Sequence, residues 1–561
     1  MAIEVKVHAN GDDALIAWEP KPWPDEWVGF ALEKRNVKVN ETVTLMNRIP
    51  ASAKTDKVKV PEGGVPSNES PIRRCIWTDH SVDLTDEVEY RVIPMKQSGA
   101  TFTRIEDEAS EWTAPLEVAV EDKAGLTVAF NRGTLMSQVV SRFVKGDVSV
   151  ASLKKLKASL SKPGSPVRAY LSGQARDLLL KFLADANHRG SEIYAALYEL
   201  NDPELLSALE AFGKRGNVLL GNGSSTTDEV PGELQDAHLK VHHRDLSHGK
   251  GSSPSVHNKF VVEVSKGGKA LRVLTGSTNW TTTGLCTQLN NALVIERPKV
   301  AERFHAQWQA LVAAGDDLPD ELKTENAKWL KDGPVSLAFA ATKGQKEFAP
   351  VLDLINGAQS GILFLMFTPG QSPLLSAILE RTEAASGLYI RGVVSTVNEV
   401  KDPEDPKSEG KITSHEGSVF RNGSKEPGTF KETLLPEGVP TDNTPPWALE
   451  EFQRKLFFAA GLNAIVHSKA IVIDPFSPNC AVITGSHNFS PAASQKNDEN
   501  LVIVRGDQAL AQSYAVHMQG VYDHYAWRVF LMNGGDPTKI FQTLASWKNG
   551  PKHKDLQFWL Q

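Results

Sequence analysis

Hydrophobic positions in the first 120 residues tend to alternate with polar ones, which is the spacing of β-strands. Residues 14–18 and 27–32 are short runs rich in strand-forming side chains, residues 89–93 alternate, and proline, glycine and aspartate separate the runs. Residues 1–120 are therefore predicted to form a small all-β domain. The segment holds no cluster of catalytic residue types, so we expect it to pack, to target the chain or to bind a protein partner.

One spacing in this segment suggests what kind of β-domain it is. Leu84 lies six residues before Tyr90, just ahead of a strand-like run. The spacing resembles the tyrosine corner of fibronectin type III and immunoglobulin-like domains. The resemblance implies a β-sandwich over residues 1–120, and an unrelated small β-domain is the alternative.

From residue 126 the pattern changes to apolar strands that alternate with helices, and it occurs twice. The matching segments are 126–130 with 335–339, 191–197 with 361–367, and 203–209 with 373–378. Each apolar run leads toward a segment whose leucine spacing suits one buried helix face. The period of about 170 residues is too long for a solenoid repeat and predicts a duplicated α/β domain. We place the two α/β halves at residues 125–320 and 334–535.

The C-terminal part is predicted to add one core helix and a tail. Residues 509–532 bring Tyr514, Met518, Val521 and Tyr525 onto one stripe, as in a packed amphipathic helix, and residues 536–561 follow as a tail. The longest apolar runs fall far short of the ~20 residues that span a bilayer. The N-terminal ten residues lack the apolar core of a secretory signal. These features predict a soluble cytoplasmic protein, although secretion by a signal-independent route would leave no mark in the sequence.

Composition narrows the possible functions only slightly. The 561 residues include 61 basic and 68 acidic side chains, a formal charge of −7. This balance argues against a general nucleic-acid binder but allows a local basic groove. Cys75, Cys286 and Cys480 are widely separated and fit neither a disulfide framework nor a metal-ligand pattern. The sequence predicts no metal or other cofactor.

Two long polar stretches interrupt the halves, at 221–255 and 398–446. Loops of such length in compact domains are usually functional or mobile. We expect the first to be functional, through substrate contact, because it directly precedes the motif described next and carries many basic and histidine side chains: His238, His242, His243, Arg244, His248 and Lys250. For the second, a lid and a surface insertion remain equal alternatives.

The chemically informative residues form two matched sets. The first comprises His257, Lys259, Gly276, Ser277, Asn279 and Asn290; the second comprises His467, Lys469, Asp474, Gly485, Ser486, Asn488 and Glu499. The glycine follows the histidine by 19 positions in the first set and by 18 in the second, and the sets then align without a gap. A single HxK carries little information, since His238 and Lys240 form another with no GSxN at the right distance. Two copies inside a duplicated domain carry much more.

The duplicated HxK and GSxN pattern resembles the phospholipase D superfamily over about residues 125–535. The resemblance implies two α/β halves related by pseudo-twofold symmetry, with one HxK from each half in a single site. It also implies phosphodiester cleavage or transfer through a phosphohistidine, without a metal. The catalytic residues would be His257, Lys259, Asn279, His467, Lys469, Asn488 and Glu499. Ser277, Asn290 and Ser486 would bind substrate, and Asp474 would be structural.

The residue types suit this chemistry. Histidine and lysine at positions i and i+2 of a strand project from one face, so each half offers an imidazole and an ammonium. The lysines would stabilise a phosphate that gains negative charge in the transition state. One imidazole would attack phosphorus, and the other would protonate the leaving oxygen and later activate water or an alcohol.

The differences between the halves suggest roles for the two histidines. Glu499 stands where the first half has Asn290. We expect each acceptor to pair with the histidine of its own half, because a carboxylate would favour the protonated form of His467 as the general acid. His257 beside the neutral Asn290 would then be the nucleophile, as the first-half histidine commonly is in the superfamily. In the alternative, Glu499 orients the nucleophile.

Some positions depart from the family pattern or are weaker candidates. Val264 replaces the motif aspartate in the first half, and Glu263 is expected to face the other way. We interpret this as a tolerated change, with a degenerate, binding-only first half as the alternative. Trp280 and Phe489 are more often core than channel residues, and His487 either faces the site or packs.

The motif alone does not identify the substrate. A phospholipase D-like hydrolase, with or without transphosphatidylation activity, suits the acidic balance and is our first expectation. A nuclease is the alternative, because residues 484–490 with 497–500 also resemble small bacterial nucleases of the superfamily and Arg244, Lys250 and Lys259 would begin a basic channel. A non-catalytic scaffold that binds anionic partners is the third reading.

Overall fold

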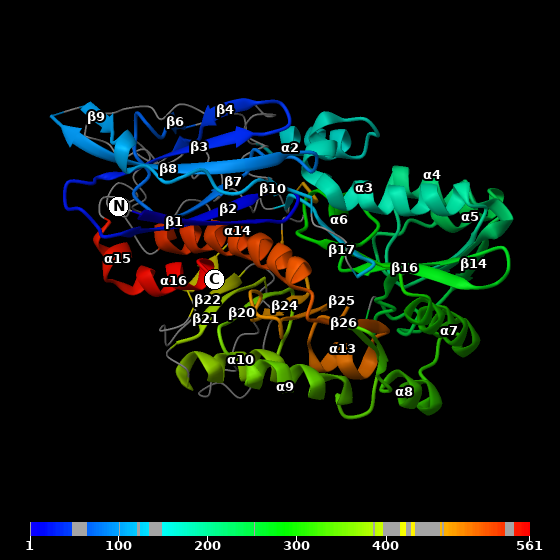
Figure 1. Ribbon diagram of the computed structural model, residues 1–561. Helices are drawn as coiled ribbons and strands as arrows, with labels where there is room; N and C mark the ends of the chain where they lie inside the picture. The colour runs from blue at the N-terminus through cyan, green and yellow to red at the C-terminus, as the bar shows by residue number, and fades with distance from the viewer. Residues whose placement is uncertain are drawn as a thin grey trace. The chain divides into compact units, whose positions relative to one another are not determined.

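The computed structural model describes residues 2–47, 64–99, 101–119, 124–133, 149–251, 253–384, 387–395, 416–421, 428–431, 460–462, 465–532 and 544–561. These residues form two compact units. The described residues of the first unit fall in Met1–Glu121 and Gln512–Gln561, and those of the second unit lie between Asp122 and Ala511. Each unit has its own sheets (Figure 1).

The first unit is built on two antiparallel sheets, which confirms the predicted all-β region. One sheet has the order β1-β2-β7, with strands Ala2–Ala9, Ala14–Lys21 and Ile76–Asp79. The other has the order β10-β8-β3-β4, with strands Leu116–Glu117, Glu87–Ser98, Gly29–Asn36 and Glu41–Thr44, and β9 (Thr101–Arg104) also pairs with β8. A short β5–β6 ladder joins Met46–Asn47 to Val65–Pro66. The division into two antiparallel sheets resembles an immunoglobulin-like sandwich.

The tyrosine-corner detail is wrong. Tyr90 is buried on β8, but its hydroxyl donates to the carboxylate of Asp79 at 3.0 Å. Leu84 is 46% exposed and contributes little to the core. The buried hydroxyl still finds the acceptor that it needs, but at the end of β7.

The C-terminal segment is more than a tail. Residues 545–548 and 551–559 form helices α15 (Ala545–Lys548) and α16 (Pro551–Trp559), and α16 packs against β2. Trp559 is fully buried, and its carbonyl lies 3.0 Å from Nε2 of His8 on β1. The boundary between the units falls inside α14 (Gln508–Met532), whose predicted stripe from Tyr514 to Tyr525 is buried.

The second unit contains two sheets whose strand orders repeat, which confirms the duplication. The first sheet has the order β11-β17-β16-β15-β12-β13-β14, and the second has the order β18-β19-β26-β25-β24-β20-β21-β22-β23. The run from β11 to β13 therefore corresponds to the run from β19 to β21. Directions agree as well, because β12–β13 and β20–β21 are parallel while β12–β15 and β20–β24 are antiparallel.

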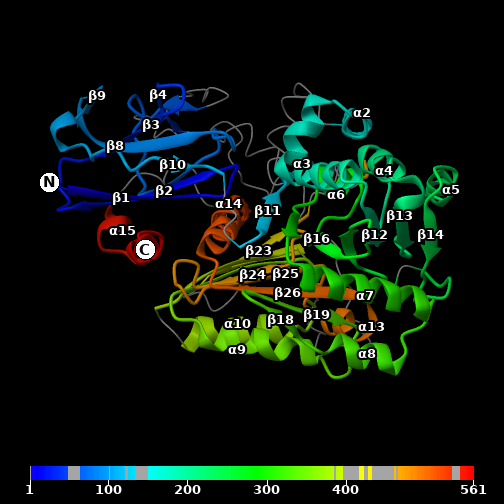
Figure 2. The ribbon, with the colours of Figure 1, turned by 45° about the vertical axis from the view of Figure 1, so that its right-hand side comes forward.

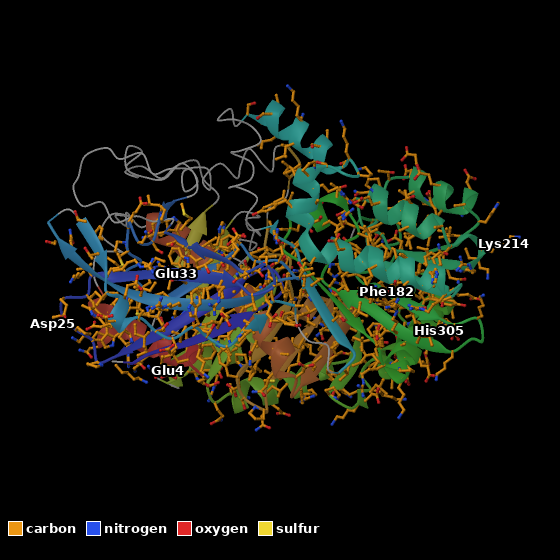
Figure 3. The ribbon with its side chains drawn as sticks, turned by 45° about the horizontal axis from the view of Figure 1, so that its top comes forward. Glu4, Asp25, Glu33, Phe182, Lys214 and His305 are labelled. Atoms are coloured by element: carbon orange, nitrogen blue, oxygen red, sulfur yellow. The ribbon has the colours of Figure 1, made fainter. Side chains whose placement is uncertain are left out.

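The strands of the first half are β11 (Leu126–Phe130), β12 (Glu192–Leu197), β13 (Gly216–Leu220), β14 (Lys240–His243), β15 (Lys259–Val264), β16 (Ala270–Gly276) and β17 (Asn291–Ile295). Its helices are α2 (Val150–Leu160), α3 (Pro166–His188), α4 (Pro203–Glu210), α5 (Glu229–Asp236), α6 (Thr282–Cys286) and α7 (Pro298–Ala314). Figure 2 shows α3 and α7 on opposite sides of this sheet. Figure 3 labels one side chain on each of them, Phe182 and His305.

The second half follows α8 (Asp320–Asn326). Its strands are β18 (Leu330–Asp332), β19 (Val335–Ala340), β20 (Gly361–Met366), β21 (Tyr389–Val394), β22 (Glu416–Arg421), β23 (Gly428–Lys431), β24 (Ala470–Ile473), β25 (Ala481–Gly485) and β26 (Glu499–Arg505). Its helices are α9 (Ala349–Gly357), α10 (Pro373–Ala384) and α13 (Pro491–Lys496).

The two polar stretches have different outcomes. The segment 221–255 is no single loop, because it contains α5 and β14. The segment 398–446 lies largely outside the described residues, which include only β22 and β23 of it. In the described part of the chain, no helix combines the length and apolarity that crossing a bilayer requires.

Candidate active site

The two HxK motifs meet where the halves face each other. His257 precedes β15 and His467 precedes β24, and their ring centroids lie 6.4 Å apart. The two histidine residues are only 5% and 3% exposed. The lysines are buried beside them, and each Nζ donates to the carbonyl of the histidine in its own motif, at 2.7 Å for Lys259 and 2.6 Å for Lys469.

The pairing of histidines with their acceptors is the reverse of the expected one. Nδ1 of His257 lies 2.9 Å from Oε2 of Glu499, and Nδ1 of His467 lies 2.9 Å from Oδ1 of Asn290. Each histidine therefore pairs with the acceptor of the other half. The prediction of a His467–Glu499 pair is wrong.

Backbone pairing between the halves explains this exchange. The amide of His467 donates to the carbonyl of Leu289, and the amide of Leu289 donates to the carbonyl of Ile465. In the reciprocal place, the amide of Asp498 donates to the carbonyl of Ser255. The segment just before β17 thus runs beside the second-half motif and places Asn290 there. The segment just before β26 runs beside the first-half motif and places Glu499 there.

The motif serines hold these acceptors. Ser277 Oγ donates to Oδ1 of Asn290 at 2.8 Å, and Ser486 Oγ donates to Oε2 of Glu499 at 2.7 Å. Both serines, like Asn290, were expected to bind substrate. The structure instead places the two serines and Asn290 in a chain that orients the imidazoles.

The motif glycines have a clear steric reason. Gly276 and Gly485 have φ values of 138° and 136°, a region that residues with a Cβ rarely adopt. A Cβ on either would lie 2.4 Å from a backbone oxygen, of Asn291 or of Asn500. Only glycine lets the turn pass this close to the neighbouring strand.

Two aromatic residues that line the motifs were not predicted from the sequence. Tyr198 follows β12, with its ring centroid 4.9 Å from that of His257 and 4.9 Å from Nζ of Lys259. Phe367 follows β20 and lies 4.8 Å from the His467 ring and 5.2 Å from Nζ of Lys469. The repeat itself held the signal, because each residue directly follows the corresponding strand of its half.

In the first half, Glu263 takes the structural role of the missing motif aspartate. Asp474 accepts from the backbone of residues 359–361 and from Ser360 Oγ at 3.0 Å, which anchors the start of β20. Glu263 is fully buried and accepts from Ser191 Oγ at 2.8 Å, just before β12. Arg189 and Arg272 pair with the same carboxylate. Glu263 therefore anchors the matching strand.

The weaker candidates mostly belong to the core. Trp280 is buried in the hydrophobic core of the first half, and Phe489 is buried in the hydrophobic core of the second half. His487 is fully buried, with its Nε2 3.5 Å from the Glu347 carboxylate. In the 221–255 stretch, His238, His243 and His248 are exposed. Within the described ranges, no three histidine, cysteine or acidic residues are grouped to hold a metal ion.

Arg244, an expected contact for a nucleic-acid strand, is instead a structural residue. Its Nε lies 2.7 Å from Oδ2 of Asp498, and both side chains are fully buried. It also donates to the carbonyls of Gly315 and Asp317. This ion pair connects the first half to Asp498, the residue just before Glu499.

Removing this arginine is expected to destabilise the protein strongly. Arg244→Leu would leave Asp498 buried without its partner, which costs about 3–5 kcal/mol in typical proteins. Denaturant unfolding would measure the loss, with Lys250→Leu as an exposed control expected to change stability by less than about 0.5 kcal/mol. Equal stability of the two variants would contradict this role for Arg244.

Burial governs the electrostatics of the site. It lowers the pKa of Lys259 to about 7 and the pKa of Lys469 well below its usual value. Burial and the nearby lysines also lower the pKa of both histidines. The pKa of Glu499 is raised to about 8, again chiefly by burial. Lys259 and Glu499 therefore change protonation near neutral pH, as groups in catalytic sites commonly do.

Comparison with known proteins identifies the family. The family model described as "Cardiolipin synthase, PLD-like domain" matches residues 179–312 and 351–522, more than half of the chain. The chain belongs to this phospholipase D-like family. The match extends over both halves and includes both HxK motifs.

Curated relatives within the phospholipase D group match only locally. Proteins named "Phospholipase D" from Rickettsia conorii and Rickettsia typhi are 50% and 48% identical to this phospholipase D-like chain over 50 residues. That is 9% of the chain and 22% of each relative. The chain therefore spans less than a quarter of the length of these relatives.

Solved phospholipase D-like structures resemble the chain more broadly but distantly. Phosphatidylserine synthase from Haemophilus influenzae aligns at 12% identity with a TM-score of 0.40. The alignment covers 70% of this chain and 94% of the synthase chain. The phospholipase D family member Nuc from Salmonella typhimurium aligns with 26% of the chain and 90% of its own, at 24% identity and a TM-score of 0.21.

Proposed function

We propose that this protein is a phosphodiesterase that forms a phosphohistidine on His257. The observation that carries the proposal is the facing pair of buried histidines, each with a lysine and an oriented Nδ1. A hydrogen bond at Nδ1 leaves Nε2 as the nitrogen that can face phosphorus. The site thus offers one nucleophile and one proton donor on either side of a phosphate.

The observed pairing supports His257 as the nucleophile for a new reason. Glu499 accepts the Nδ1 proton of His257, which orients the ring and stabilises positive charge on it. That charge develops when Nε2 forms its bond to phosphorus. His467 has only the neutral oxygen of Asn290, so its proton is more easily given up to the leaving oxygen.

The reaction then has two balanced steps. In the first, Nε2 of His257 bonds to phosphorus, the bond from phosphorus to the leaving oxygen breaks, and His467 gives that oxygen its proton. In the second, His467 takes a proton from water or an alcohol, whose oxygen bonds to phosphorus while the bond to His257 breaks. The lysines stabilise the negative charge throughout.

A phospholipid is the proposed substrate class, as hydrolysis or transphosphatidylation. The identity shared with the Rickettsia proteins named "Phospholipase D" supports it, as does the family description. A nuclease remains the second candidate because the motif suits any phosphodiester. One argument for a nuclease no longer holds, because the guanidinium of Arg244 is buried and paired with Asp498.

A paired turnover assay in excess chelator tests the proposal. Phospholipid vesicles and single- and double-stranded DNA would be offered side by side, with His467→Ala as the blank. Head-group release without DNA cleavage is the expected result. DNA cleavage alone would make the protein a nuclease, and turnover of neither would favour the scaffold reading.

Binding of an anion is expected to weaken above neutral pH. Burial lowers the pKa of Lys259 to about 7, so the free site loses this positive charge as the pH rises past that value. The Kd of dimethyl phosphate, whose charge is constant here, should rise toward about tenfold per pH unit between 7 and 9. Calorimetric titration would measure it, and Lys259→Gln should show a shallower rise. A flat profile in the parent protein would contradict the assignment.

A further inference from the structure

A third carboxylate lies beside the catalytic groups, outside both motifs. Glu199 follows Tyr198 at the end of β12 and is 8% exposed. Its Oε2 accepts from Nδ2 of Asn279 at 2.9 Å, and its Oε1 accepts from the backbone amide of Ser225 at 3.2 Å. The carboxylate is therefore fixed directly on a motif side chain.

Only the first half carries this acid. Tyr198 and Phe367 occupy equivalent places after β12 and β20, so the residue that corresponds to Glu199 is Thr368. Asn279 still keeps a second N–H for a ligand, since a primary amide has two. Holding Asn279 therefore does not by itself require a charged partner.

The negative charge of Glu199 acts electrostatically on both site lysines. Its negative charge raises the pKa of Lys259 and of Lys469, which partly opposes the effect of burial. Glu499 acts on both in the same direction. Glu199 therefore adds an acid that the motifs lack, so the site carries less positive charge than the motif residues alone would give it.

We infer that Glu199 is a specificity-determining residue that makes the site favour a monoanionic phosphodiester over a dianionic phosphomonoester. The inference rests on the proposed phosphodiesterase function. A phosphodiester has one negative charge, whereas a phosphomonoester has nearly two at neutral pH. The fixed carboxylate repels the second charge more than the first. Hydrolysis of a diester yields a monoester, so the same repulsion promotes product release.

Two small probes test the inference without turnover. Dissociation constants of dimethyl phosphate and methyl phosphate would be measured by calorimetry at pH 7.5 for the parent protein and Glu199→Gln. The ratio of the two constants should shift by about tenfold in favour of methyl phosphate, as one unit charge in a partly buried site predicts. A ratio that does not change would overturn the inference, because a purely structural role affects both probes alike.

Two further variants serve as a negative control and a reciprocal test. Glu347→Gln removes another buried carboxylate, one that holds Ser494 and Thr342, and should leave the ratio unchanged. Thr368→Glu adds an acid at the equivalent place and should shift the ratio the other way, even if Glu199→Gln folds poorly. Failure of the proposed function looks different, since the parent protein would then bind neither probe and cleave no phosphodiester.

Discussion

Replacing His467 with alanine is expected to stop turnover of a phosphodiester with an alkoxide leaving group, yet to preserve a single burst with a p-nitrophenyl ester. A nitrophenolate leaves without a proton, so the first step no longer needs the general acid. The second step still lacks its base, so the phosphohistidine accumulates. Loss of steady-state activity should be about a thousandfold or more.

The matched variant separates the two histidines. His257→Ala removes the nucleophile and should give no burst with either ester. Rapid-quench kinetics would measure the burst, and peptide mapping under alkaline conditions would locate the phosphoryl group on residue 257. A burst in His257→Ala and none in His467→Ala would reverse the two roles.

The second large effect is expected at the acceptor of the nucleophile. Glu499→Gln keeps the size of the side chain but removes the carboxylate that orients His257 and would stabilise the positive charge of the phosphohistidine. Loss of an equivalent carboxylate in a catalytic triad costs up to about ten thousandfold, and we expect about a hundredfold to a thousandfold here. The measurement is kcat/KM for an activated diester across pH 5–9.

Asn290→Asp is the reciprocal control. It gives His467 a carboxylate partner in place of the neutral oxygen at 2.9 Å. The new charge favours protonated His467, so the pH–rate profile should move to higher pH while the maximum changes by less than about tenfold. If Glu499→Gln retained activity within threefold of the parent, the proposed orienting role would be wrong.

The duplicated architecture was predictable because its signals are local. An apolar run that leads into a helix and a motif that recurs at nearly the same spacing are both visible in the sequence, and the repeated strand order confirms the duplication. The resemblance to the phospholipase D superfamily implied that His257 and His467 act in one site, and the structure gives the separation of their rings.

The errors concern contacts between distant segments. Glu499 and Asn290 were assigned within their halves because nothing in the sequence shows that Leu289 pairs with residues 465 and 467. Glu263 was given no structural role because it lies one position from the place of the motif aspartate, and only its contacts with Ser191 and Arg189 show that it anchors the start of β12. Glu199 carried no motif, and only its bond to Asn279 makes it visible.

Helix α16 has a consequence for the order in which the protein is made. It packs on β2, and Trp559 is buried against His8, so the β-domain is completed by residues that are translated as many as 551 positions after its first strands. Domains generally fold as units as they leave the ribosome, at about 5–20 residues per second. The catalytic halves can therefore assemble during translation, while the N-terminal sheets wait tens of seconds with one face uncovered. A chaperone that shields this face would act during that interval.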